Sequence, residues 1–440
     1  MNTLPHPTAP PHAGYSERRR RAMLAILFLV ALCSYLDRHV VAILLEPIKQ
    51  EFGASDTRMG LLTGFAFAIF YATLGIPVAR WSDRGDRKQV ISLALLTWSA
   101  FTVLCGFATS FWQLAMARVG VGVGEAGAIP PAQSLLADYF PPARRGAALA
   151  VLMSSATVGY VLAFIGGAWL AQHHGWRTAL IAAGLPGLVL TIAVRWVLDE
   201  PRRTRSVAAA TAGPASPTIA GEAPAADNLP QALRTLRGKS SYLWLLGGAA
   251  SYGLVAYGAL IFVPSFMVRS LGVTLTQVGM GFGSVSAAVA LCGTLAGGVV
   301  ADRLARRDAR WYAWLPALAC AAALPFQTGA LLASSFAVFL LLLSTGGLLL
   351  GLGVPSMFTA LHLVCGSPQR SLAVALLTFT LSLIGSGLGP LMTGALSDAL
   401  APVWGQDSLR LAMLAANTFL VAAAYCFHRC ARALPADLAP

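Results

Sequence analysis

The sequence predicts an all-α integral membrane protein, with twelve transmembrane helices in two pseudo-symmetric six-helix bundles. Three observations lead to this fold class. The 440 residues are 57% hydrophobic and only 11% charged, whereas soluble domains carry about 25% charged residues. Apolar runs near 20 residues, the length that crosses a bilayer, recur along the chain. A short charged motif appears twice, at matching places in the two halves.

The apolar runs define the organisation of the chain. After a cytoplasmic tail over residues 1–21, an amino-terminal bundle occupies 22–199 and a carboxy-terminal bundle 241–428, and a second cytoplasmic tail covers 429–440. Residues 200–240 are rich in Ala, Pro and Gly and form a cytoplasmic linker, with a short surface helix over 230–239. The predicted spans are 22–45, 59–80, 89–109, 111–135, 146–171, 177–197, 241–268, 276–301, 311–333, 335–362, 371–397 and 408–428.

The net charge of +13 has a sided distribution. Basic residues gather before the first span and in alternate loops, and the remaining loops hold few of them. The positive-inside rule therefore places both termini and the linker in the cytoplasm, in a bacterial inner (plasma) membrane. Because topology accounts for the charge, no nucleic-acid partner is expected. The first apolar run is too long for a cleaved signal peptide and carries Asp37 and Arg38.

A repeated motif follows the second and eighth spans. Residues 79–88 read ARWSDRGDRK and residues 298–307 read GVVADRLARR, so the two copies are 219 residues apart. The repeated acid can meet the positive end of a neighbouring helix or an Arg of the other half. We expect the motif to form a cytoplasmic gate that latches the halves in the outward-facing state, through Asp83, Arg84, Arg87, Lys88, Asp302, Arg303 and Arg306.

The eleventh span contains GSGLGPLMTG, with Gly385, Gly389, Pro390 and Gly394. Glycines four residues apart let helices approach closely, and a proline bends the helix. This run predicts tight helix packing.

Four charges lie within apolar runs: Asp37 and Arg38 in the first span, Arg118 and Glu125 in the fourth. Each costs about 2.5–3.5 kcal/mol at a helix centre, so such charges usually mark a functional site. Arg118 and Glu125 are about two turns apart and share one helix face, which must look into a cavity. A carboxyl group whose Arg partner moves with conformation gains or loses a proton. We expect proton coupling through Glu125, Asp37 and Arg118; the alternative is a permanent ion pair that joins the two spans.

Local strings around these charges are similar to a known family. The doubled motif and the twelve spans resemble the major facilitator superfamily, although the first copy has Ala79 and Asp86 where glycine is usual. The strings SYLDRHVVAILLEPIK and RVGVGVGEAGAIPPAQSLLADYF resemble its spinster-like branch. This resemblance implies proton-coupled transport of lysophospholipids or sphingosine phosphate-like lipids. It makes Glu125 the proton site, with Asp37 and Arg118 in its network and Arg38 near the substrate headgroup.

The second half carries almost no charge within its spans. Cations on one side of a cavity and an apolar wall on the other suit an amphipathic anion. We expect the substrate to contact Arg38, Arg118 and Glu125 in the first half and, in the second, Tyr252, Tyr257, Thr359, His362 and Thr378. His362 is a candidate second titrating group or a packing residue.

Two other functions stay open. A branch of small organic-anion/proton symporters has a similar D-R and G-x-x-E-A pattern, and a non-transporting membrane sensor would use the same cavity. No catalytic constellation, phosphate loop or metal cluster is present in the loops, and the seven cysteines lack metal-ligand spacing. We therefore expect no enzyme activity, cofactor or metal. The expected partners of this monomer are an anionic substrate, protons and the lipid bilayer.

Overall fold

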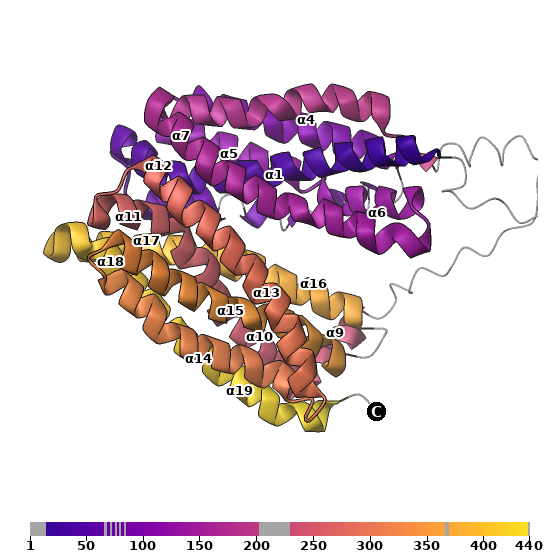
Figure 1. Ribbon diagram of the computed structural model, residues 1–440, viewed down its shortest axis with the longest axis vertical. Helices are drawn as coiled ribbons and strands as arrows, with labels where there is room; N and C mark the ends of the chain where they lie inside the picture. Colours follow the sequence, from indigo (N-terminus) through magenta and orange to yellow (C-terminus); the bar gives the residue numbers. More distant parts are fainter. Residues whose placement is uncertain are drawn as a thin grey trace, which may run out of the picture.

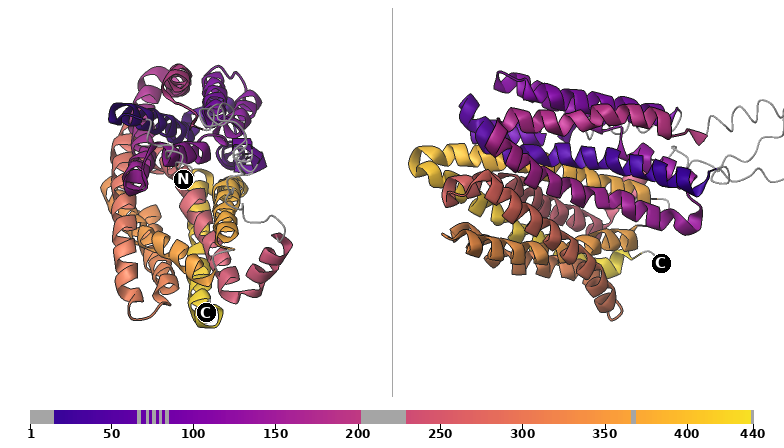
Figure 2. Two further views of the ribbon diagram at one scale, coloured as in Figure 1. Left: turned by 90° about the vertical axis from the view of Figure 1, so that its right-hand side faces the viewer. Right: turned by 45° about the horizontal axis from the view of Figure 1, so that its top comes forward.

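The computed structural model of the protein describes residues 15–201 except 66–67, 71–72, 75–76, 79–80 and 83–84, together with residues 229–365 and 369–438. Within these residues the regular secondary structure is helical. The helices form two groups, the amino-terminal one at the top of Figure 1 and the carboxy-terminal one below it. The left panel of Figure 2 looks along the two groups and shows them as an upper and a lower bundle.

The amino-terminal bundle is built on two long helices. The first of them, α1 (Glu17–Phe52), begins at a cap in which Ser16 accepts a hydrogen bond from the Arg19 amide, and it ends at Gly53, which has φ 56°. The second of them, α7 (Pro142–Val197), is interrupted at Gly175 (φ 82°), where the fifth and sixth spans meet. In order, the elements are α1 (Glu17–Phe52), α2 (Asp56–Gly60), the π-helical turn η2 (Leu61–Phe65), α4 (Arg87–Gly106), α5 (Phe111–Glu125), α6 (Ile129–Tyr139) and α7 (Pro142–Val197).

The carboxy-terminal bundle follows a short surface helix, α9 (Leu229–Gly238). Its spans contain several π-helical and 3₁₀ turns between α-helical segments. The elements are α10 (Ser240–Gly253), η4 (Leu254–Ala259), η5 (Leu260–Phe262), α11 (Val263–Leu271), α12 (Leu275–Gln277), η6 (Val278–Gly283), α13 (Ser284–Ala305), α14 (Trp311–Leu332), α15 (Phe336–Val364), α16 (Arg370–Thr380), η7 (Leu381–Leu388), α17 (Gly389–Trp404), η8 (Gly405–Asp407), α18 (Ser408–Asn417) and α19 (Phe419–Asp437).

Eight helical stretches of the described residues are long and apolar enough to cross a membrane. Two of them, Pro142–Val197 and Leu372–Asp437, each contain two predicted spans. The fourth predicted span is divided into α5 and α6, and the second passes through a segment that is described only in part. The twelve predicted spans are accounted for in this way. The first helix starts at Glu17 and the last ends at Asp437, so both extend beyond the predicted apolar runs.

The separation between the two bundles differs between the two ends of the molecule. We call the end that holds Glu17, Pro201, α9 and Asp437 the linker end, and the opposite end the far end. The ribbons of the two bundles lie together at the far end, on the left of Figure 1, and diverge toward the linker end.

The hydrophobic core explains this difference in spacing. One buried core fills the amino-terminal bundle and continues across to far-end residues of the other bundle, including Phe266, Phe282 and Phe339. A second core, which includes Leu361 and Leu434, belongs to the carboxy-terminal bundle alone. Apolar burial therefore joins the bundles at the far end.

Candidate functional site

The centre of the candidate site is an ion pair between α1 and α5. Arg38 Nη2 lies 2.7 Å from Glu125 Oε2, and Arg38 Nε lies 3.3 Å from the same oxygen. The Glu125 side chain is fully buried, whereas 30% of the Arg38 side chain is exposed. Glu125 is the last residue of α5, and this helix packs so closely on α4 that a Cβ on Gly124 would lie 2.6 Å from the Trp98 nitrogen. Arg38 is therefore the accessible partner of a rigidly held carboxylate.

Asp37 and Arg118 lie behind this pair, inside the amino-terminal bundle. Both are buried, with 1% and 2% of their surface exposed. Thr102 of α4 donates a hydrogen bond of 2.8 Å to Asp37 Oδ2, and the charges of Glu125 and Arg118 both act on Asp37. The structure thus brings together the four charged residues expected from the sequence. Arg38 and Glu125 form an ion pair, and Asp37 and Arg118 lie deeper in the bundle. The sequence did not show that Arg38 is the cation bonded to Glu125. It also did not show that Thr102 donates a hydrogen bond to Asp37.

One oxygen of each buried carboxyl group, Asp37 Oδ1 and Glu125 Oε1, has no hydrogen-bond partner among the described residues. Buried polar atoms are nearly always hydrogen-bonded, and the exceptions concentrate where protons or ligands bind. This leaves each carboxyl group with an oxygen that can carry a proton.

An aromatic contact beside the charged pair was not foreseen from the sequence. The ring of His39, the residue after Arg38, lies 4.9 Å from the ring of Tyr160 on α7. The Tyr160 hydroxyl is 2.9 Å from the Ser286 hydroxyl of α13, in the other bundle. The only sequence signal was the adjacency of His39 to the charged residues.

The candidates of the second half are distributed over several places. Tyr257 is 46% exposed, and the charge of Arg38 acts on it from the opposite bundle. Tyr252 instead lines a small apolar pocket inside its own bundle, with Pro316 and Cys320 among its neighbours. Thr359 donates a hydrogen bond of 3.1 Å to the Pro355 carbonyl of its own helix.

His362 and Thr378 are both exposed. His362 lies in the last turn of α15 and Thr378 on α16, both in the part of the bundle that leads to the linker end. Of the second-half candidates, Tyr257 is linked to the charged pair through the charge of Arg38.

In the first copy of the repeated motif (79–88), which we call with the second copy (298–307) the linker-end motif, the contacts of Arg87 lie within one bundle. Asp83 and Arg84 lie outside the described residues. Arg87 is 1% exposed, and its guanidinium bonds Glu200 at 2.6 Å and Asp138 at 2.7 Å, with a further hydrogen bond to Ser134. Sequence reasoning missed these two acids, because carboxylates at the ends of spans look like solvated loop residues.

The rest of the motif is more accessible. Lys88 is half-buried, and Asp302, Arg303 and Arg306 are exposed. Asp302 accepts a hydrogen bond of 3.0 Å from Tyr312, in its own bundle. In this conformation the contacts described for Arg87 and Asp302 lie inside their own bundles.

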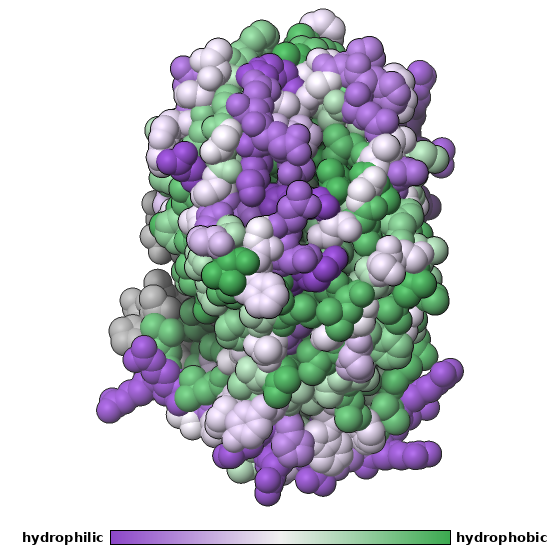
Figure 3. Space-filling view, turned by 90° about the vertical axis from the view of Figure 1, so that its left-hand side faces the viewer, coloured by the Kyte–Doolittle hydropathy of each residue, from purple (hydrophilic) through white to green (hydrophobic). Residues whose placement is uncertain are grey.

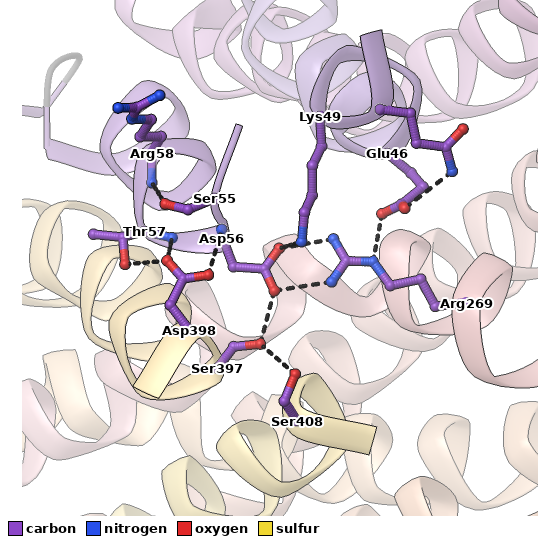
Figure 4. Close-up of polar contacts among 11 residues, drawn as sticks. Glu46, Lys49, Ser55, Asp56, Thr57, Arg58, Arg269, Ser397, Asp398 and Ser408 are labelled. Carbon is purple, nitrogen blue, oxygen red and sulfur yellow. Dashed lines mark hydrogen bonds and ion pairs between the residues drawn. The ribbon is translucent and has the colours of Figure 1, made fainter. Parts of the chain in front are cut away.

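The far end holds a charged cluster that joins the bundles (Figure 4). Arg269 of the carboxy-terminal bundle bonds Glu46 at 2.6 Å and both oxygens of Asp56 at 2.7 and 2.9 Å. Lys49 adds a bond of 2.6 Å to Asp56. We call Glu46, Lys49, Asp56, Arg269, Ser397 and Asp398 the far-end cluster. Figure 3 looks onto this end, where hydrophilic residues run from the top of the face to its middle.

The electrostatics of the cluster follow from these contacts. Burial by itself raises the pKa of Asp56, but the hydrogen bonds from Arg269 and Lys49 and the charge of Arg269 outweigh it, and the pKa falls from 3.8 to about 2. Asp56 therefore stays ionised at any physiological pH. The far-end cluster was not predicted from the sequence, although charges next to span ends were a visible signal.

Comparison with known proteins gives a consistent family. Residues 27–390 match the Major Facilitator Superfamily. An MFS-type efflux pump of Mycolicibacterium smegmatis is 34% identical over 400 residues, which cover 91% of this chain and 90% of that protein. A D-galactonate transporter of Escherichia coli is 27% identical over 307 residues, covering 68% of this chain and 70% of that protein.

A solved structure is similar over the whole fold. It is the crystal structure of a bacterial homolog to the human lysosomal transporter Spinster, in an inward-facing and unoccupied conformation. The TM-score is 0.85 at 30% sequence identity, with 97% of this chain and 100% of that chain covered.

Proposed function

Because the chain belongs to the Major Facilitator Superfamily, and to its spinster-like members, we propose that it is a proton-coupled secondary transporter that moves an amphipathic anion by alternating access. The substrate class is a lysophospholipid or a sphingosine phosphate-like lipid. The chain acts as a monomer in the bacterial inner membrane. The linker end faces the cytoplasm, in agreement with the basic residues gathered there.

The observation that carries the proposal is the Arg38–Glu125 pair. Arg38 is partly exposed and its charge acts on Tyr257 of the other bundle, while the Glu125 side chain is fully buried. An anionic headgroup that binds Arg38 must replace Glu125 as its partner. A buried carboxylate that loses its cation is strongly destabilised, so Glu125 takes up a proton instead. Anion binding and protonation are thereby linked at one site.

Asp37 and Arg118 support this exchange. Their burial places them behind Arg38, so we assign them to the proton network, with Arg118 stabilising charge from within the bundle. Arg118 then contributes to headgroup binding through the field that it creates, and Arg38 makes the contact. Tyr257 lies on the opposite wall, and Thr359, His362 and Thr378 line the path to the linker end. Tyr252, inside its own bundle, supports this wall from behind.

The linker-end motif is the cytoplasmic gate in this proposal. Asp83, Arg84, Arg87, Lys88, Asp302, Arg303 and Arg306 would join the bundles when the far end opens. The far-end cluster would open at the same time. The present conformation, closed at the far end, corresponds to the inward-facing state.

A small organic-anion/proton symporter is the second candidate, and the similarity to a D-galactonate transporter favours it. The apolar second bundle favours the lipid-like substrate, because a small polar anion needs polar contacts on both sides. A non-transporting sensor has no such support from the comparisons.

A binding experiment separates the first two candidates. Purified protein is heated with lysophosphatidylglycerol or with galacturonate, and the shift in unfolding temperature is measured. We expect lysophosphatidylglycerol to stabilise the wild type, and Arg38→Ala to abolish the shift. The matched control Arg410→Ala removes a half-buried arginine at the far end that pairs with Asp407, and it should keep the shift. Stabilisation by galacturonate alone would favour the symporter, and stabilisation of the Arg38→Ala variant would refute the headgroup role.

A further inference from the structure

Asp398 of the carboxy-terminal bundle bonds the backbone of the amino-terminal bundle. Its Oδ1 accepts a hydrogen bond of 2.9 Å from the Asp56 amide, and its Oδ2 accepts one of 2.7 Å from the Thr57 amide and one of 2.5 Å from the Thr57 hydroxyl. These amides belong to the first turn of the second span, which α2 and η2 begin. Figure 4 shows the Asp398 carboxylate aimed at this turn. One side chain thus makes three charge-assisted bonds across the bundle boundary.

The same turn has a cap of its own. Ser55 accepts a hydrogen bond of 3.3 Å from the Arg58 amide. The bond between Ser55 and the Arg58 amide joins residues of one segment. The bonds from Asp398 exist only while the eleventh span lies against the second. The contribution of Asp398 therefore depends on the arrangement of the two bundles.

Backbone packing makes the dependence steep. A Cβ on Gly394, one turn before Asp398, would lie 2.2 Å from the Asp56 carbonyl oxygen, and a Cβ on Gly60 would lie 2.3 Å from the Pro390 carbonyl oxygen. Ser397 adds a bond of 2.7 Å to Asp56 Oδ2. Because the two backbones are in direct contact, a small separation of the bundles breaks all the bonds of Asp398 together.

The arrangement has a counterpart in the sequence at the linker end. The second span starts at the far end beside Asp398 and leads to Asp83 of the repeated motif, while the eleventh span runs from Arg370 toward Asp398. In the sequence, the second span is followed by Asp83, and the eleventh span carries Asp398 toward its carboxyl end. The two spans run in opposite directions, so the start of each span lies at the end of the molecule where the other span has its acid.

From this we propose that Asp398 is a positioning residue for the transport cycle, which holds the far end closed by capping the second span and alternates with Asp83 at the linker end. The proposal rests on the alternating-access function proposed above. Loss of Asp398 moves the resting equilibrium toward the far-end-open state by about tenfold or more, since hydrogen bonds to a charged group are among the stronger ones.

The test measures two distances in the full chain in lipid nanodiscs. Nitroxides on p-acetylphenylalanine, which spare the native cysteines, are placed at His174 and Ser334 for the far end and at Ala143 and Ala436 for the linker end. These four positions are solvent-accessible or lie in end segments of the two bundles. Double electron–electron resonance then reports both distance distributions without substrate and without a pH gradient.

We expect Asp398→Ala to populate longer far-end distances and shorter linker-end distances, and Asp398→Asn to do so to a smaller extent. The control Asp407→Asn changes an exposed far-end acid that pairs with Arg410 in its own bundle, and it should leave both distributions unchanged. In the double variant with Asp83→Ala and Asp398→Ala, both distance distributions should return to those of the wild type.

Unchanged distributions in both Asp398 variants would overturn the proposal. So would a widening at both ends, which would indicate a merely structural role. If the distances shift as expected while lysolipid binding fails, the substrate proposal is wrong and the role of Asp398 stands.

Discussion

At the scale of single residues, the Arg38–Glu125 pair combines a buried anion with a half-accessible cation. An ion pair that is buried on both sides resists exchange, because either partner left alone is unstable. Here the side chain of Glu125 is fully buried, whereas 30% of the Arg38 side chain is exposed. The pair can therefore exchange its anion at Arg38 while the proton compensates at Glu125. This asymmetry distinguishes it from a pair that only fastens two helices together.

Asp56 gives a prediction for pH dependence. Its pKa is about 2 in the folded protein and 3.8 without its partners. A lowered pKa contributes stability that is fully present above pH 4 and is lost as the pH falls toward 2, an effect of about 2 kcal/mol. We expect Asp56→Asn to lower the unfolding temperature by a constant amount between pH 8 and pH 5, and by less below pH 4.

Thermal unfolding of both proteins across this pH range provides the measurement. The control Asp407→Asn alters a more exposed ion pair and should change the unfolding temperature little. A difference between wild type and Asp56→Asn that already shrinks between pH 8 and pH 6 would show that the far-end cluster responds to physiological protonation.

The four intramembrane charges could be predicted from sequence because their cost in a bilayer makes them conspicuous. Their pairing could not, because the rotation of α1 about its axis decides whether Asp37 or Arg38 faces Glu125 on α5. Glu200, Asp138 and the far-end cluster were missed for another reason. Charges at span ends carry little cost in sequence, and only the fold shows that Arg87 and Asp56 are buried.

At the scale of elements, the glycines of the eleventh span allow close backbone contact with the seventh span. The sequence predicted close packing around GSGLGPLMTG, and the structure confirms it. A Cβ on Gly385 would lie 3.0 Å from the Gly253 Cα, and a Cβ on Gly389 would lie 2.7 Å from the Gly258 Cα. The partners of these glycines could not be predicted, because a glycine run shows that something comes close but not which helix does.

Gly394 allows a prediction at this scale. Leucine at this position would collide with the Asp56 carbonyl and push α17 away from α2. We expect Gly394→Leu to lengthen the far-end distance between labels at His174 and Ser334. The control is Gly166→Leu on α7, because a Cβ there meets nothing within 4 Å. An unchanged far-end distance in Gly394→Leu would mean that the contact is not needed for closure.

At the scale of the whole molecule, the fold was predictable and the conformation was not. The apolar runs and the duplicated motif identify two six-helix bundles, because bilayer thickness and internal repetition restrict the architecture. Which end is closed depends on a few contacts, such as Arg269 with Glu46 and Asp56. Two states of such a molecule differ by only a few kcal/mol, which no sequence pattern reports.

The central claim is that one site couples anion transport to protons through Glu125. The most direct test is the uptake of labelled lysophosphatidylglycerol into proteoliposomes with and without an imposed pH gradient. We expect gradient-dependent flux by the wild type, and flux by Glu125→Gln that no longer responds to the gradient although lysolipid still binds. Full gradient-driven flux by Glu125→Gln would contradict this claim.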